Sequence, residues 1–163
     1  MKRKSSFPPV VAADTRVLVL GSLPGERSLA AGQYYAYPQN RFWHLMGGVI
    51  GRDLEGVDYD DRLAGLLAAG VGLWDTVASA TRTGSLDADI RAPEHNELAE
   101  LVASLPHLCA VGMNGATAAR IAGAQLSAAA VALVPLPSSS AAYAAMPLAE
   151  KERRWGELAR YLR

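Results

Sequence analysis

Two short loops, about 110 residues apart, each follow an apolar run with the composition of a buried β-strand. The first loop is Gly-Ser-Leu-Pro-Gly at residues 21–25, and the second is Leu-Pro-Ser-Ser-Ser at residues 136–140. If both runs are parallel strands of one sheet, the loops meet at its carboxyl edge, where open α/β sheets bind ligands. We therefore expect a ligand site at that edge.

The hydrophobic pattern alternates between strand-like and helix-like segments along the whole chain. Strands are expected at residues 15–20, 71–77, 108–113 and 130–135, and helices at 41–50, 60–69, 93–104, 114–123 and 148–162. This alternation predicts a single α/β domain over residues 1–163, a three-layer α/β/α sandwich around a mainly four-stranded parallel sheet. Residues 1–10 are expected to form a flexible basic arm, and residues 79–89 a polar loop.

The chain has no net formal charge at pH 7, but its charges are unevenly distributed. Residues 1–52 carry seven Lys and Arg against two Asp and Glu, and residues 101–163 carry six against three. Residues 53–100 carry three against eleven. Both loops lie in the basic parts, which permits a basic face for phosphate contacts, unless folding mixes the charges over the surface.

Missing residues exclude several kinds of site. A lone Cys109 cannot form an internal disulfide, a zinc site of several thiolates or an iron–sulfur cluster, and His44, His95 and His107 lack metal-ligand spacing. The glycine-rich phosphate loops and the G-x-S-x-G nucleophile elbow are absent. We expect no metal and no cofactor. With no apolar run long enough to span a membrane and no secretory h-region, we expect a soluble, cytosolic protein with no membrane partner.

Residues 34–43 read Tyr-Tyr-Ala-Tyr-Pro-Gln-Asn-Arg-Phe-Trp. Aromatic faces, an amide and a guanidinium are the groups that hold a nucleobase and its phosphate. The three serines after Pro137 suit anion binding through hydroxyls and backbone N–H groups. A serine esterase that pairs one of them with a histidine is a weaker alternative.

Further motifs lie between the two loops. In chain order the set is Gly-Ser-Leu-Pro-Gly at 21–25, Tyr-Tyr to Asn-Arg-Phe-Trp at 34–43, Leu-Trp-Asp at 73–75, Arg-Thr-Gly-Ser-Leu-Asp at 82–87, Met-Asn-Gly at 113–115 and Leu-Pro-Ser-Ser-Ser at 136–140. This order resembles the uracil-DNA glycosylase superfamily, and within it the hypoxanthine-DNA (deoxyinosine) glycosylase branch, sometimes called family 6. The resemblance covers residues 15–150. It implies the superfamily's fold and a monofunctional glycosylase that flips a deaminated base out of DNA and hydrolyses its N-glycosidic bond, leaving an abasic site.

The resemblance also implies roles for the residues around the base. Asn40 is the expected catalytic residue, orienting the attacking water, although an asparagine here also suits a helix N-cap. Asn114 is expected to contact the Watson–Crick edge of the base, again with a helix cap as the alternative. Tyr35 is expected to stack on the base. The base-binding set is Asn114, Tyr35, Gly21, Ser22 and Phe42.

For the DNA backbone, the resemblance implies that Ser138, Ser139 and Ser140 contact the phosphates flanking the lesion. The segment that follows, which ends at Tyr143, is expected to approach the minor groove and fill the gap left by the base, with the side chain that enters the gap left open. Arg41 and Arg82 are further phosphate-contact candidates. Ala141 stands where this branch often has proline.

The loop at residues 21–25 has no Asp or Asn, the residues that activate water in the better-known uracil-removing families. Hypoxanthine is therefore the expected base, and DNA with deaminated bases the expected partner of a monomer. No lysine lies in the motif loops, which argues against a Schiff-base lyase. A non-catalytic nucleic-acid or nucleotide-binding module of the same fold is the alternative from another class.

Overall fold

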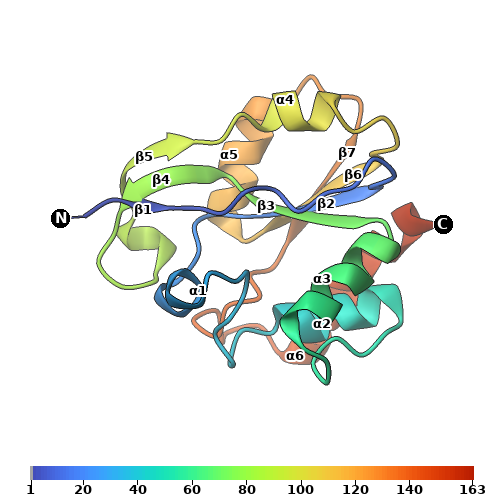
Figure 1. Cartoon of the computed structure of the whole chain (residues 1–163), viewed down its shortest axis with the longest axis horizontal. Helices are drawn as coiled ribbons and strands as arrows, with labels where there is room; N and C mark the ends of the chain where they lie inside the picture. The colour runs from blue at the N-terminus through green and yellow to red at the C-terminus, as the bar shows by residue number, and fades with distance from the viewer. Residues whose placement is uncertain (1) are drawn as a thin grey trace.

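Four apolar segments form a central parallel sheet in the computed structural model, which describes residues 2–163 (Figure 1). The strands are β2 (Val17–Gly21), β3 (Val71–Asp75), β6 (Ala110–Asn114) and β7 (Ala132–Leu136), in the order β3-β2-β6-β7. Gly21 pairs with Asp75, and Asn114 pairs with Leu136. The last residues of all four strands therefore lie along one edge.

Successive residues of β2 point to opposite faces of this sheet, and both faces are buried. Val17 and Val19 join one hydrophobic core, and Leu18 and Leu20 join another. A strand that is buried on both sides reads as a continuous apolar run, which is why the sequence identifies it. The predicted three-layer α/β/α sandwich is confirmed.

Helices cover the two faces in two groups (Figure 1). One face packs against α2 (Phe42–Ile50), α3 (Tyr59–Ala68), α6 (Leu148–Trp155) and the 3-10 segment η2 (Gly156–Leu162). The other packs against α4 (Leu98–Ala103) and α5 (Ala116–Leu126). The helix expected at 148–162 therefore changes to 3-10 geometry at Gly156. The short helix α1 (Glu26–Ala31) was not predicted.

A second sheet, which the sequence did not indicate, lies at one end of the molecule. It is antiparallel, with β1 (Lys4–Ser5), β4 (Val77–Thr81) and β5 (Arg91–His95) in the order β1-β4-β5. The strand expected at 71–77 thus ends at Asp75, and the next strand belongs to the second sheet. The prediction of a helix from residue 93 was wrong, because residues 91–95 pair with β4 and α4 begins only at Leu98.

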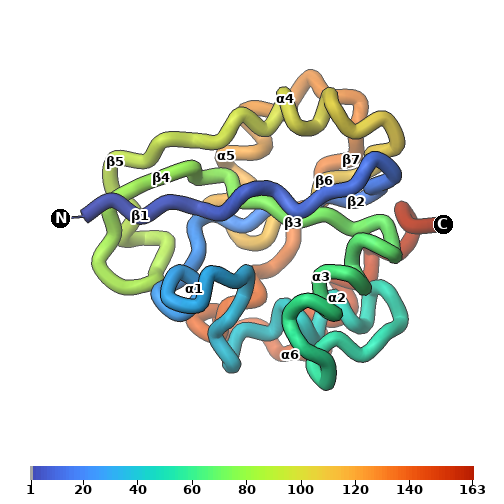
Figure 2. Tube along the Cα trace, in the orientation of Figure 1, coloured from blue at the N-terminus to red at the C-terminus, as the bar shows by residue number. Residues whose placement is uncertain are grey.

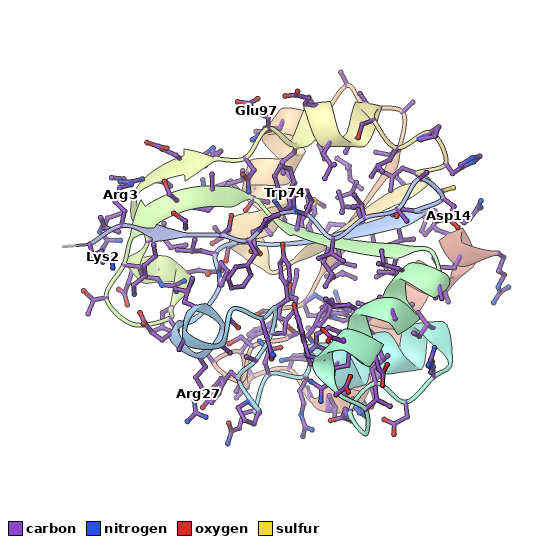
Figure 3. The ribbon with its side chains drawn as sticks, in the orientation of Figure 1. Lys2, Arg3, Asp14, Arg27, Trp74 and Glu97 are labelled. Carbon is purple, nitrogen blue, oxygen red and sulfur yellow. The ribbon has the colours of Figure 1, made fainter. Side chains whose placement is uncertain are left out.

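The N-terminal segment is packed rather than flexible from Lys4 onward, which corrects the expected free arm. The tube in Figure 2 shows it running alongside β4 and β3. Val10 exchanges two backbone hydrogen bonds of 2.9 Å with Leu73. The indole of Trp74, labelled near the centre of Figure 3, donates to the Phe7 carbonyl at 3.1 Å. These contacts hold the segment against the edge strand β3.

Candidate active site

A cavity of about 1040 Å³ opens at the carboxyl edge of the parallel sheet. The ends of the four strands and the loops that follow them line it. Both signature loops contribute, so the expected meeting of residues 21–25 with residues 136–140 is confirmed by the lining. The other expected site residues on its wall are Tyr35, Asn40, Asn114 and Tyr143.

The Gly-Ser-Leu-Pro-Gly loop is held from behind by Arg82. This guanidinium is 1% exposed and donates to the carbonyl oxygens of Leu23, Pro24 and Gly84. Arg82 therefore does not reach a phosphate, and the prediction that it does was wrong. Gly21 and Ser22 both line the cavity, and the Ser22 hydroxyl donates to Asp87 Oδ1 at 2.6 Å.

Tyr35 forms an aromatic wall in an uncommon backbone conformation. Its φ of 54° is in the left-handed region, which bulky residues rarely adopt and which is often found at functional sites. Its ring stacks on Phe42 with centroids 3.8 Å apart, and Phe42 is fully buried outside the cavity lining. Phe42 thus supports Tyr35 from behind and does not itself contact a base, contrary to the prediction. Trp43 is buried in the core.

Asn40 lies in the loop before α2 and lines the cavity. Its Oδ1 accepts from the Phe42 backbone N–H at 3.0 Å, but the N-cap residue of α2 is Arg41, so Asn40 lies one residue before the predicted cap position. One lone pair of this oxygen remains for a second donor such as water. The Arg41 backbone N–H donates to the Ser139 carbonyl at 2.9 Å, and this bond ties the Asn40 loop to the serine loop.

Asn114 and Ser139 form a closed pair at the end of β6. Asn114 Nδ2 donates to Ser139 Oγ at 2.9 Å, and Ser139 N–H donates to Asn114 Oδ1 at 2.9 Å. A longer contact of 3.4 Å joins Nδ2 to the Tyr35 hydroxyl. Ser139 is 1% exposed and its hydroxyl is already bonded to Asn114, so its side chain positions the loop, and its contact with a phosphate stays a prediction. Only the second lone pair of Asn114 Oδ1 remains for a base.

Ser138 and Ser140 are partly exposed beside this pair and line the cavity. Tyr143 is 39% exposed, and the Lys151 ammonium lies 5.2 Å from its ring centroid. Lys151 also donates to the Ser140 carbonyl, 11 residues before it in the sequence, at 3.4 Å. Burial and the nearby Arg41 lower the pKa of Lys151. Arg41 itself is exposed, as a phosphate-contact residue must be.

Asp75 is a cavity residue to which the sequence analysis gave no role. It is the last residue of β3, it is 4% exposed, and it lines the cavity. Because the strand was expected to continue to residue 77, Asp75 was placed inside a strand rather than at the ligand-binding edge. A polar residue interrupting an apolar run was the available signal.

Other chemistries find no support in the residues that the structure describes. His44 contacts Glu55 and Glu152, and no hydrogen bond within residues 2–163 joins a histidine to a serine of the 138–140 loop. No group of three His, Cys, Asp or Glu in that part of the chain could hold a metal ion. No helix there is long and apolar enough to cross a membrane.

The sequence matches the model of a known protein family. Residues 8–159 match the model described as the uracil DNA glycosylase superfamily. The chain belongs to this superfamily. The assignment confirms the resemblance drawn from the six motifs, and the match covers both loops and nearly the whole fold.

Curated relatives within the superfamily include two proteins named hypoxanthine DNA glycosylase. The protein from Methanosarcina barkeri is 42% identical over 113 residues, which cover 69% of this chain and 72% of that protein. The protein from Methanosarcina acetivorans is 38% identical over 112 residues, 69% of this chain and 71% of that one. A solution NMR structure of a candidate uracil DNA glycosylase from Methanosarcina acetivorans has a TM-score of 0.89 and 34% identity, with 99% of both chains covered.

Proposed function

We propose that this chain is a DNA repair glycosylase that removes hypoxanthine from deoxyinosine in DNA. The nucleotide is flipped into the cavity, its N-glycosidic bond is hydrolysed, and an abasic site remains. The observation that carries the proposal is the cavity itself. It presents a stacked tyrosine, an asparagine amide with free hydrogen-bonding capacity and a serine loop on a single wall. The names of the curated relatives agree with the choice of base.

Asn40 is the proposed catalytic residue. Hydrolysis through an oxocarbenium-like sugar needs a positioned water more than a strong nucleophile. The bond from the Phe42 N–H fixes the Asn40 side chain, and its second oxygen lone pair can then accept from the water. The amide thus acts through position, which does not require a pKa near neutrality.

Tyr35 and Asn114 are the proposed contacts to the flipped base. The exposed face of Tyr35 can stack on the purine, since the opposite face already lies on Phe42. The remaining lone pair of Asn114 Oδ1 can accept from N1–H of hypoxanthine, whereas adenine has no hydrogen on N1. Gly21 and Ser22 line the same part of the cavity.

Phosphate contacts are proposed for the hydroxyls of Ser138 and Ser140 and for Arg41, with Tyr143 entering the gap left by the base. Arg27, which projects outward from α1 in Figure 3, also lines the cavity and lies over the ring of Tyr37. Base flipping gives no reason to expect more than a monomer, and we expect the protein to act in the cytoplasm.

The test is alkali-developed cleavage of labelled oligonucleotides that carry deoxyinosine, deoxyuridine or a normal base at one position. We expect cleavage at deoxyinosine that is almost abolished in Asn40→Ala. Gln39→Ala is the matched control, since it removes an exposed amide next to Asn40 that does not line the cavity. Oligonucleotide binding, measured by gel shift, should persist in both variants. Unchanged turnover in Asn40→Ala contradicts the catalytic role, and binding without cleavage by the parent chain favours a binding module.

A further inference from the structure

Asp75 lines the cavity, and one oxygen of its carboxyl group has no hydrogen-bond partner among the described residues. Its Oδ2 is buried and accepts no hydrogen bond from the described residues. Its Oδ1 lies 2.6 Å from the point that a Cβ on Gly21 would occupy, and the Tyr35 hydroxyl lies 2.9 Å from that point. The carboxyl group is therefore next to the proposed base-stacking ring.

An unpartnered buried carboxyl is costly in its ionised form, so a native structure rarely keeps one without a reason. No described cation forms an ion pair with Asp75. The charged groups that influence it are Asp87, from the segment η1 (Asp87–Asp89), and Arg82. Arg82 is committed to loop carbonyls, and Asp87 is exposed and bound by Ser22.

These surroundings favour the neutral acid. Burial, and secondarily the Asp87 charge, raise the pKa of Asp75 to about 7, against a smaller opposing effect of Arg82. A neutral carboxylic acid carries an O–H donor, which an ionised carboxylate lacks. The nearby tyrosines also carry O–H groups, but burial raises the pKa values of Tyr34 and Tyr35 above the usual range, so they give up a proton much less readily than the carboxylic acid does.

The proposed reaction needs such a donor. When the C1′–N9 bond of deoxyinosine breaks, its electron pair moves into the purine ring, and a proton on N7 stabilises that charge. The amide of Asn40 and the serine hydroxyls are not acids near neutral pH. The other carboxyl groups in the lining are Glu26, whose pKa is lowered by Lys4, and the exposed Asp87.

We propose that Asp75 is the general acid of this site and transfers its carboxyl proton to N7 of the flipped hypoxanthine. The inference rests on the proposed function. As the C1′–N9 bond breaks, its electrons stay with the base and the proton forms the N7–H bond. The water held by Asn40 bonds to C1′ and loses one proton, which restores the Asp75 acid. One water is consumed, and an abasic site and neutral hypoxanthine are formed.

The test is the single-turnover rate of hypoxanthine release as a function of pH. General acid catalysis contributes roughly 10²–10⁴-fold, so Asp75→Asn should lower the rate by about that factor near pH 6. In the parent chain the rate should fall as pH rises through about 7, where the acid ionises, and in Asp75→Asn this fall should be absent. Asp60→Asn, an exposed carboxyl on α3, is the matched control and should retain the parent rate and profile.

A second variant keeps the test valid if Asp75→Asn does not fold. Asp87→Asn removes the nearby negative charge and should move the fall in rate to lower pH, because that charge raises the pKa of Asp75. A substrate with 7-deazahypoxanthine has C–H in place of N7, and the parent chain should excise it roughly 10²–10⁴-fold more slowly than hypoxanthine.

The outcomes separate the two proposals. If the parent chain releases hypoxanthine and Asp75→Asn does so at the same rate and with the same pH profile, Asp75 is not the acid and the proposed function stands. Equal excision of 7-deazahypoxanthine and hypoxanthine by the parent chain also overturns the role of Asp75. If the parent chain releases no hypoxanthine at any pH, both proposals fail.

Discussion

Replacing Asp75 by asparagine should make the protein more stable, and the gain should grow with pH. The ordinary pKa of 3.8 applies in the unfolded chain, and burial raises it to about 7 in the folded one. Between these values the folded state holds a proton that the unfolded state has lost. The contribution of protonated Asp75 to the unfolding free energy is therefore fully present below about pH 4 and is lost as pH rises through about 7. Asparagine cannot ionise and shows no such loss.

The magnitude follows from the two pKa values. At about 1.4 kcal/mol per pKa unit, the difference between 3.8 and about 7 amounts to about 4 kcal/mol of unfolding free energy. In a chain of 163 residues this corresponds to roughly 10 °C in Tm. In Asp75→Asn, the amide group that replaces Oδ2 also lacks a hydrogen-bond partner. The unfolding free energy lost in this way does not vary with pH.

The assay is urea denaturation of the parent chain and Asp75→Asn at several pH values from 4 to 8. The difference between their unfolding free energies should increase over this range and level off just above pH 7. Asp60→Asn, which removes an exposed carboxyl, should show almost no such trend. A difference between parent and Asp75→Asn that stays constant from pH 4 to 8 would refute the neutral acid, whatever the enzymatic result.

Two further predictions concern the loop at residues 21–25. Arg82→Ala removes a buried donor from three carbonyl groups, and we expect the unfolding free energy to fall by about 3 kcal/mol; an unchanged urea midpoint would show that these bonds contribute little. Gly21→Ala places a methyl group 2.6 Å from Asp75 Oδ1 and 2.9 Å from the Tyr35 hydroxyl. A displacement of about 1 Å can reduce turnover about 100-fold, so deoxyinosine cleavage should fall by that order, and parent-like turnover would argue against the tight packing of this wall.

The parallel sheet could be predicted because its strands are short apolar runs buried on both faces. The antiparallel sheet could not, because its strands have no such pattern. Every residue of β5 is exposed, and Pro93 with its charged neighbours resembles a helix start. The pairing of β4 with the N-terminal β1 also joins distant segments, since Lys4 pairs with Ala80. Local sequence does not encode such pairings.

In the candidate active site, too, some residues could be predicted from the sequence and others could not. Tyr35 and Asn40 lie on the cavity wall as expected, since each follows from a local motif. Arg82 and Ser139 were assigned to the DNA surface because a guanidinium and a hydroxyl suit phosphate. Both are buried instead, by partners in other loops, namely the carbonyls of residues 23 and 24 and the amide of Asn114. A sequence shows which groups can bind, but only the fold shows which are already satisfied.

The missing side chain at Gly21 and the position of the Asp75 carboxyl group depend on each other. Gly21 lies at the end of β2, directly opposite Asp75 on β3, and any side chain at position 21 would collide with Asp75 Oδ1. Because Gly21 has no side chain, the carboxyl group of Asp75 on the neighbouring strand β3 has room at this edge. An acid placed there lies at the sheet edge beside Tyr35, within the cavity that we propose receives the base. A departing purine benefits from a proton on its ring, and the room left by Gly21 lets Asp75 supply it, while Asn40 takes the water-positioning role for which the loop has no Asp or Asn.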